Sequence, residues 1–366
     1  MKTKKIRKMK KEIFKQGLLI LAAILLAFSL KAQEVTKEFR KEFTAGKNTT
    51  VEISNRYGNV VVTSWDSDKV DIYVKVTIEL PDRSRAEKLI NLIDVQFSEG
   101  TDLVAAKTVI DDKFSFSGWG GTNRKFSINY TVKMPYYCNL SLANRYGNTD
   151  IDEIRGYVNL DIKYGNLTVT KLTRQDEKPL NKIYIAYGKG LIKEAGWIDL
   201  NLRYTTSFEL PLAKAVLIDS RYSKFKAGEL SSLVSVAKYD NYTIEKINNL
   251  VIEAAYTSLN IDNLAKKLNI DGSYGSVNVN FVPKGFESID INTRYTGVRV
   301  GIDPSASYKL DGRSSYGSIK VDEERLKIKK RIIENTSSEI EGIVGSDESP
   351  SSTVKVSTSY GSVRLF

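Results

Sequence analysis

The sequence predicts an all-β fold, a single-stranded β-solenoid of the parallel β-helix kind with rungs of about 18 residues. Three observations predict it. A tyrosine recurs at nearly constant spacing, apolar residues alternate at period two on both sides of it, and each unit is too short to bury an apolar face unless it stacks on its neighbours. The open end of such a stack needs a cover, and an N-terminal cap containing one helix is expected to supply it.

The recurring tyrosine defines the unit. Between Tyr146 and Tyr316 successive members are 18, 23, 17, 18, 17, 17, 18, 21 and 21 residues apart, and seven of the twelve are followed by glycine. The set consists of Tyr57, Tyr146, Tyr164, Tyr187, Tyr204, Tyr222, Tyr239, Tyr256, Tyr274, Tyr295, Tyr316 and Tyr360.

The flanks of the tyrosine predict two strands per unit. Residues six and four positions before it are apolar, as Leu268 and Ile270 are before Tyr274, and so are those three and five positions after it, as in Val277 and Val279. Alternation at period two indicates half-buried strands. Parity predicts that the tyrosine points inward with the apolar residues, and that the glycine provides the backbone freedom for the corner.

Residues 1–32 are predicted to be a signal peptide. Met1 to Gln16 carries eight Lys or Arg, Gly17 to Leu30 is an apolar run of 14 residues, and a small residue, Ala32, follows. A spanning helix needs about 20 apolar residues, so export without a transmembrane span in the mature chain is expected, with an uncleaved N-terminal anchor as the alternative.

Removal of this segment changes the meaning of the charge. The whole chain has a net charge of +11, but residues 33–366 hold 46 basic and 43 acidic side chains, a net of +3. No nucleic-acid partner is therefore expected.

Residues 33–135 are interpreted as an N-terminal rung and cap, and 136–366 as the solenoid with an insertion near 325–352. The cap is expected to contain a helix over Asp82–Ile93 that begins at an Asp82 cap. Its strand-like segments are Val70–Leu80, Leu103–Ile110 and Phe126–Lys133. The insertion is expected to be a strand-loop-strand excursion, with basic Arg325–Arg331 followed by a polar loop, Asn335–Ser352.

The residue types present argue against catalysis. The chain has no histidine and one cysteine, Cys138, which is expected to be buried; most zinc sites, the Ser-His-Asp triad and the Cys-His dyad are thereby excluded. The carboxylates are scattered rather than clustered as a polysaccharide-cleaving β-helix requires. No catalytic residue, metal site or cofactor is predicted.

A basic residue often precedes the tyrosine and is expected to face outward. Stacking would align these residues in a basic column that could bind a polyanion such as an acidic glycan. The alternative is a solvated charge ladder, because acids such as Asp161 and Asp219 lie two positions earlier on the same face. The candidate residues are Arg145, Lys163, Arg203, Arg221 and Lys238.

Four outward positions on three consecutive units are apolar, and we name them the apolar patch: Leu217, Val234, Val236 and Val251. An exposed apolar surface indicates a contact site. The alternative is cover by an inserted segment of the same chain.

A glycine-rich segment around Phe114, Phe116 and Trp119, the aromatic loop, is the remaining candidate. Its rings could stack on sugars, or they could pack on the cap.

The Tyr-Gly units, the lead-in Asn144-Arg145-Tyr146-Gly147-Asn148 and Met134-Pro135 before the repeats resemble the adhesin-like β-solenoid domains of exported bacterial proteins. These include the putative auto-transporter adhesin head (GIN) family. The signal ending in Lys31-Ala32-Gln33 is similar to those of Bacteroidetes. The resemblance covers residues 34–366 and implies an exported β-solenoid, with no functional residues to transfer.

The function expected from these features is that of a non-enzymatic, adhesin-like binding or scaffolding module of the cell envelope. It would lie in the periplasm, on the outer-membrane surface or outside the cell, with an envelope glycan or another protein as partner. The alternatives are a β-helical enzyme acting on polysaccharide and a periplasmic structural protein without a ligand.

Overall fold

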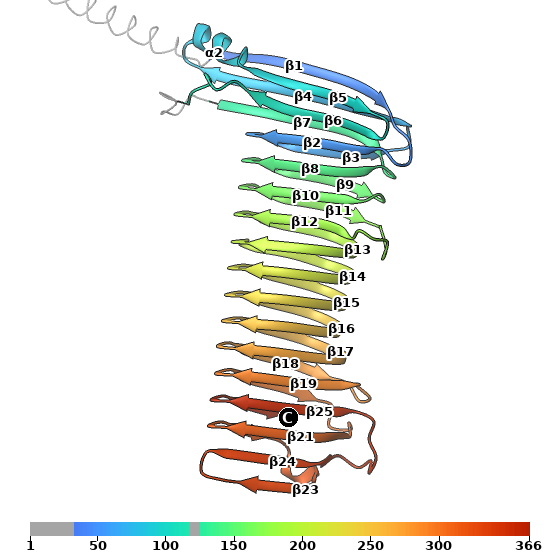
Figure 1. Ribbon diagram of the computed structural model, residues 1–366, viewed down its shortest axis with the longest axis vertical. Helices are drawn as coiled ribbons and strands as arrows, with labels where there is room; N and C mark the ends of the chain where they lie inside the picture. Colours follow the sequence, from blue (N-terminus) through green and yellow to red (C-terminus); the bar gives the residue numbers. More distant parts are fainter. Residues whose placement is uncertain (1–32, 117–124) are drawn as a thin grey trace, which may run out of the picture.

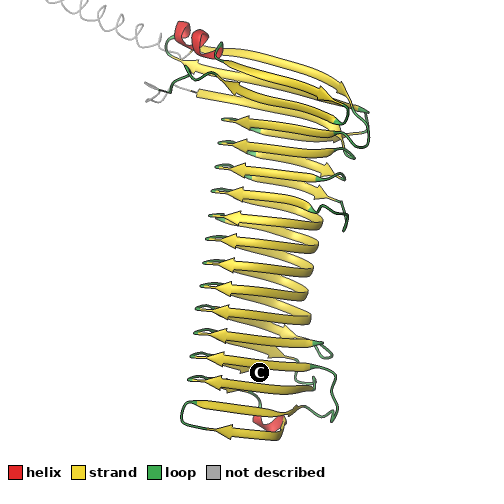
Figure 2. Cartoon of the chain, in the orientation of Figure 1, coloured by secondary structure: helices red, strands yellow, loops and turns green. Residues whose placement is uncertain are grey.

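The computed structural model describes residues 33–116 and 125–366, and the described part is a long stack of β-strands (Figure 1). It contains 26 strands, a single α-helix and a single 3-10 turn within those residues (Figure 2). The expected signal peptide, residues 1–32, lies outside them. The prediction of an all-β solenoid is confirmed.

All 26 described strands belong to one continuous hydrogen-bonded sheet that folds over the core, and each rung contributes to its two faces, which we call the first and the second sheet. The strand that precedes the tyrosine joins the first sheet, and the strand that follows it joins the second. In the middle of the stack, single long strands begin in the second sheet and bend into the first. These are β13 (Lys189–Arg203), β14 (Ser207–Arg221), β15 (Lys224–Lys238), β16 (Asn241–Ala255) and β17 (Ser258–Ser273).

The first sheet begins at the N-terminal end with β5 (Ile93–Gly100), β6 (Leu103–Ile110), β2 (Thr50–Arg56), β8 (Asn139–Arg145), β10 (Val158–Lys163) and β12 (Asn181–Ala186). After the long strands it ends with β19 (Ser288–Arg294), β25 (Thr353–Ser359), β21 (Tyr308–Ser315), β24 (Ser337–Val344) and β23 (Leu326–Ile333).

The second sheet begins with β1 (Gln33–Thr44), β4 (Lys69–Leu80), β7 (Lys125–Pro135), β3 (Val60–Trp65), β9 (Thr149–Ile154) and β11 (Leu167–Leu172). After the long strands it ends with β18 (Ser276–Val282), β20 (Gly297–Ile302), β26 (Ser362–Leu365) and β22 (Ser318–Lys320).

The core lies between the two sheets and is filled by the alternating apolar residues. Leu268 and Ile270 before Tyr274, and Val277 and Val279 after it, are all at most 5% exposed. The predicted inward faces of both strands are therefore confirmed. Parallel, in-register pairing repeats this arrangement from rung to rung.

The tyrosine corner differs from the prediction. All twelve tyrosines have φ between 51° and 66°, in the left-handed region, and the glycines that follow them do not. A positive φ breaks the alternation that parity assumes, so the tyrosine side chain points out of the corner instead of into the core. The predicted inward tyrosine column was wrong, and so was the role given to the glycine.

The glycine is needed for close approach between rungs. A Cβ on Gly165 would lie 1.9 Å from the carbonyl oxygen of Gly147, and one on Gly147 would lie 1.9 Å from that of Gly58. Where no glycine follows the tyrosine, a buried polar residue does: Thr205, Ser223, Asp240, Thr257 and Thr296.

The N-terminal end is closed by antiparallel strands and by α2 (Arg83–Ile90). Ala86, Leu89 and Ile90 are buried, and the helix packs on β4 and β1. The Asp82 side chain caps it by accepting a hydrogen bond from the Arg85 N–H at 3.2 Å. The helix is shorter than predicted, because Ile93 already begins β5. The strand-like segments of the cap coincide with β4, β6 and β7.

At the C-terminal end the order of stacking differs from the order of the chain. The rung formed by β25 and β26 lies between the rung of Tyr295 and the rung of Tyr316, as Figure 1 shows. The segment expected to be a polar loop after Arg331 instead contains β24, which forms an antiparallel hairpin with β23 beyond the last rung. Backbone pairing with β21 supports this strand despite its polar sequence.

One carboxyl group is buried beside a corner. Asp240 accepts hydrogen bonds from the Ser220 hydroxyl at 2.6 Å and from the Ser223 N–H at 2.6 Å. The Ser220 hydroxyl is also 2.6 Å from the phenolic oxygen of Tyr242, which is fully buried. Burial raises the pKa of Asp240 above its ordinary value, although these hydrogen bonds oppose the shift.

Replacing a corner glycine should destabilise the stack. We expect Gly165→Ala to lower the free energy of unfolding by about 2 kcal/mol or more, because its Cβ meets a backbone oxygen that cannot move without breaking the ladder. Gly297→Ala is the matched control, since no atom lies within 4 Å of its Cβ position; it should change stability by less than about 0.5 kcal/mol. Chemical denaturation measures both, and equal losses would contradict the close-approach argument.

Asp240 should make stability depend on pH. Between the ordinary pKa of the unfolded carboxyl and the raised pKa of the folded one, the folded state holds a proton that the unfolded state lacks. The free energy of unfolding of the wild type, relative to Asp240→Asn, should therefore fall as pH rises through that window. Denaturation curves recorded over a pH series test this, and parallel pH profiles for the two proteins would rule it out.

Candidate functional site

The tyrosine side chains form one continuous stack along an edge of the solenoid. Neighbouring ring centroids are 4.8–5.2 Å apart, and the ring planes are 3–12° from parallel. Backbone bonds fix this spacing, because the N–H of every tyrosine except Tyr316 donates to the carbonyl that precedes the next tyrosine of the stack; Tyr146 to Lys163 is one example at 3.0 Å, whereas Tyr316 at the end of the stack donates to Thr336. Tyr360 stacks between Tyr295 and Tyr316, in agreement with the strand order.

The stack presents mainly the edges of its side chains to water, because a neighbouring ring lies on both faces of every member except Tyr316, which ends the stack. All members except Tyr57 are 40–59% exposed. Tyr57 is covered at the N-terminal end by Phe116 and Phe126, at 5.3 and 5.6 Å between centroids. The edge can therefore donate and accept hydrogen bonds, but it offers few free ring faces for stacking.

The aromatic loop packs against this end of the stack. Phe114 lies 5.1 Å from Phe126 and 5.2 Å from Phe116, measured between ring centroids. Phe116 remains 44% exposed. Trp119, the third candidate for stacking on sugars, lies outside the described residues.

The candidate basic column is in register but interrupted. Arg145 and Lys163 are aligned on β8 and β10, and Arg203, Arg221 and Lys238 are aligned on β13, β14 and β15. Ala186 on β12 separates the two groups.

The charge environment differs along the column. Arg203 forms an ion pair with Asp219 at 3.0 Å, and Lys163 forms one with Asp161 at 3.4 Å. These two pairs agree with the alternative of a solvated charge ladder. Arg145, Arg221 and Lys238 form no salt bridge with the described residues, because no carboxylate oxygen among them lies within 4.0 Å of their side-chain nitrogens.

A groove of about 670 Å³ lies beside the N-terminal part of the tyrosine edge. Arg56, Lys107, Arg145 and Lys163 line it, together with three tyrosines of the stack. Sequence reasoning did not identify Lys107, because β6 is separated from β2 by a long stretch of chain and its pairing with Ser54 has no local signature.

The apolar patch lies on the outer face of the first sheet. Leu217, Val234 and Val251 are directly aligned on three consecutive strands, and Val236 lies two positions further along β15. The four side chains are 39–48% exposed, so no described segment of the chain buries them. Asp199 and Asn269 are the aligned residues on the two adjoining strands.

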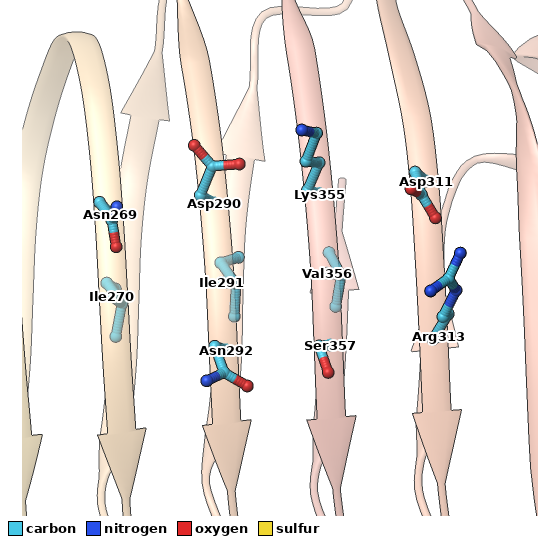
Figure 3. A pocket seen from close by; sticks show the side chains of 10 residues that line it. All are labelled: Asn269, Ile270, Asp290, Ile291, Asn292, Asp311, Arg313, Lys355, Val356 and Ser357. Carbon is cyan, nitrogen blue, oxygen red and sulfur yellow. The ribbon is translucent and has the colours of Figure 1, made fainter.

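A second hollow, of about 270 Å³, lies on the same face near the C-terminal end (Figure 3). Asp290, Lys355 and Asp311 are aligned across three strands, so that a lysine separates the two carboxylates. Arg313 on its rim pairs with Glu339 at 3.3 Å. The charges therefore alternate from strand to strand, and the lysine offsets the negative charge of the carboxylates on either side of it.

The described residues contain no group of three or more His, Cys, Asp or Glu that is placed to hold a metal ion. Cys138 is fully buried, and burial raises the pKa of its thiol to about 11, so it is not a nucleophile at neutral pH. No helix in the described part of the chain is long and apolar enough to cross a membrane.

The stack should contribute measurably to stability. We expect Tyr222→Ala to lower the free energy of unfolding by about 1–3 kcal/mol, because it removes two ring contacts worth about 0.5–1.5 kcal/mol each. Tyr222→Asn should lose less, since asparagine tolerates a positive φ better than alanine does. Denaturation of both variants provides the comparison, and an alanine variant as stable as the wild type would mean that the rings contribute nothing.

No protein-family model and no curated protein sequence matches the chain. Several solved structures align with most of the chain. A putative cell adhesion protein from Clostridium sporogenes aligns at 8% identity and a TM-score of 0.22, over 90% of this chain and 99% of that one. A putative adhesin from Bacteroides fragilis aligns at 11% identity and a TM-score of 0.27, over 90% of this chain and 97% of that one. A putative lipid binding protein from Parabacteroides distasonis aligns at 9% identity and a TM-score of 0.31, with the same two coverages. Similarity at these TM-scores carries no conclusion about the fold or activity of this chain.

Proposed function

We propose that this protein is a non-enzymatic, exported binding module of the cell envelope, adhesin-like in its use of an elongated surface. The observation that carries the proposal is the uninterrupted tyrosine edge, with about 50 Å of stacked rungs presenting hydroxyl groups to water beside an outer sheet face that carries basic and apolar groups. A surface of this length suits contact with an extended polymer or with another protein.

The distribution of polar groups supports binding over catalysis. The interior between the sheets is filled with apolar side chains, and both hollows described above lie on the outer face of the first sheet. Catalysis by paired carboxylates depends on an enclosed site that shifts their pKa values apart. Asp290 and Asp311 lie instead in an open depression with Lys355 between them.

Export is supported by the sequence of residues 1–32. The basic segment, the apolar run of 14 residues and Ala32 have the features of a cleaved signal peptide.

Expression of the full chain in a Gram-negative host tests the proposal. We expect intact mass measurement to show a mature protein that begins at Gln33, recovered outside the cytoplasm. The purified protein should bind at least one envelope component, in an array of polysaccharides and envelope proteins, without forming products.

Three outcomes would contradict this function. Cleavage of any polysaccharide would favour the β-helical enzyme. Periplasmic protein that binds nothing in the array would favour a structural role without a ligand. Full-length protein retained in the cytoplasm would remove the argument for an envelope function altogether.

A further inference from the structure

The groove beside the first tyrosines arises where two strands part. Pairing of β6 with β2 ends at Lys107 and Ser54, whereas β2 and β8 stay paired as far as Arg56 and Arg145. The outward residues Ser54 and Ala143 are small, so the surface is hollowed between the basic side chains on its two sides.

The floor of the groove is fixed by buried hydrogen bonds. The Thr108 hydroxyl donates to the Asn55 side-chain oxygen at 2.9 Å and is 2.8 Å from the phenolic oxygen of Tyr130. The Asn55 amide donates in turn to the backbone oxygens of Gly58 and Ile128 at 3.2 and 3.0 Å. The basic residues are therefore mounted on a rigid surface, which lowers the entropy cost of binding.

The groove concentrates positive charge without compensation. Arg56, Lys107 and Arg145 have no carboxylate partner within 4.0 Å among the described residues, and no carboxylate is among the described residues that line the groove. Lys163 is the exception, with Asp161 at 3.4 Å. Further along the same sheet Arg203 is paired with Asp219, whereas Arg221 and Lys238 are unpaired among the described residues; the groove differs from that region because Lys107 of β6 joins the aligned cations.

The spacing of the cations selects the shape of the ligand. Arg56, Arg145 and Lys163 occupy the same register on three consecutive strands, about 4.8 Å apart along the axis of the solenoid. A flexible linear chain with an anionic group on each unit can meet them in turn. Tyr57, Tyr146 and Tyr164 also line the groove, and their hydroxyl groups can serve as hydrogen-bonding partners.

We propose that this groove binds a linear acidic polysaccharide, through Arg56, Lys107 and Arg145 with Lys163 at one end. The proposal rests on the binding function above and names its ligand class. Single-stranded nucleic acid is disfavoured because its usual protein platform is the face of an aromatic ring, and the faces of Tyr57, Tyr146 and Tyr164 are covered by neighbouring rings.

Binding of residues 33–366 to defined polymers tests the groove. The probes are a polyuronate, a sulfated glycosaminoglycan, a neutral dextran and a single-stranded oligonucleotide, measured by calorimetry at low and high salt. We expect both acidic polysaccharides to bind, the neutral one not to bind, and the oligonucleotide to bind more weakly than either. Affinity should fall with salt, because the screening length shortens from about 10 Å at 0.1 M to about 3 Å at 1 M.

A charge-matched pair of variants locates the site. The groove variant combines Arg56→Gln, Lys107→Gln and Arg145→Gln, and the control combines Lys182→Gln, Lys224→Gln and Lys226→Gln, which removes three exposed cations that lie outside both the groove and the candidate basic column. We expect the groove variant to lose about tenfold or more in affinity and the control to change less than about twofold. Circular dichroism and the unfolding midpoint of both variants establish that the fold is retained.

Each other result overturns the inference in a recognisable way. Equal losses in the two variants would mean that net charge, not the groove, attracts the polymer. Tighter binding of the oligonucleotide would identify the wrong polymer class. Binding only to a neutral glycan or to an envelope protein would leave the binding function intact and remove the acidic ligand, whereas no binding to any component would count against both.

Discussion

The fold depends on the hydrogen bond that each tyrosine N–H, apart from that of the terminal Tyr316, donates to the next rung while the tyrosine itself adopts a positive φ. For a residue with a Cβ this conformation costs about 1–2 kcal/mol, and the chain adopts it twelve times. The ladder bond and the ring contacts offset that cost only when the neighbouring corner is in register. A slip by one residue would also turn the apolar faces of both strands into water. Local strain and long-range register therefore specify the same structure.

Much of the architecture could be predicted from the sequence, because the apolar alternation and the tyrosine spacing are local signals. The strand faces, the cap strands and the Asp82 helix cap follow from such patterns. The direction of the tyrosine side chain could not be predicted from parity. Parity assumes an extended backbone throughout, whereas the tyrosines adopt the left-handed conformation. Parity therefore fails at the corner itself, where Tyr146 is 51% exposed.

The candidate site was predictable only in part, for a different reason. Arg145 and Lys163 follow from the repeat, since they occupy equivalent positions in successive units. Lys107 belongs to the cap, outside the repeat, and approaches Ser54 through a pairing between distant segments. The break at Ala186 shows that the basic residues form two separate clusters, although the spacing pattern suggests one. Contacts between a repeat unit and an irregular segment, such as that of Ser54 with Lys107, leave no periodic pattern in the sequence.

The placement of the final rung has a consequence for the order of assembly. The segments Ser315-Tyr316-Gly317-Ser318 and Ser359-Tyr360-Gly361-Ser362 have the same four residues, and the later one stacks on the Tyr295 rung. As the chain emerges during synthesis, the earlier segment becomes available first, and it matches its twin at all four positions. If it docked on the Tyr295 rung, it would have to withdraw before the later segment entered between them. Folding at this end would then include a competition between the two segments for the Tyr295 rung. The β23–β24 hairpin would decide it, because β24 pairs with β21 and so covers the rung of Tyr316.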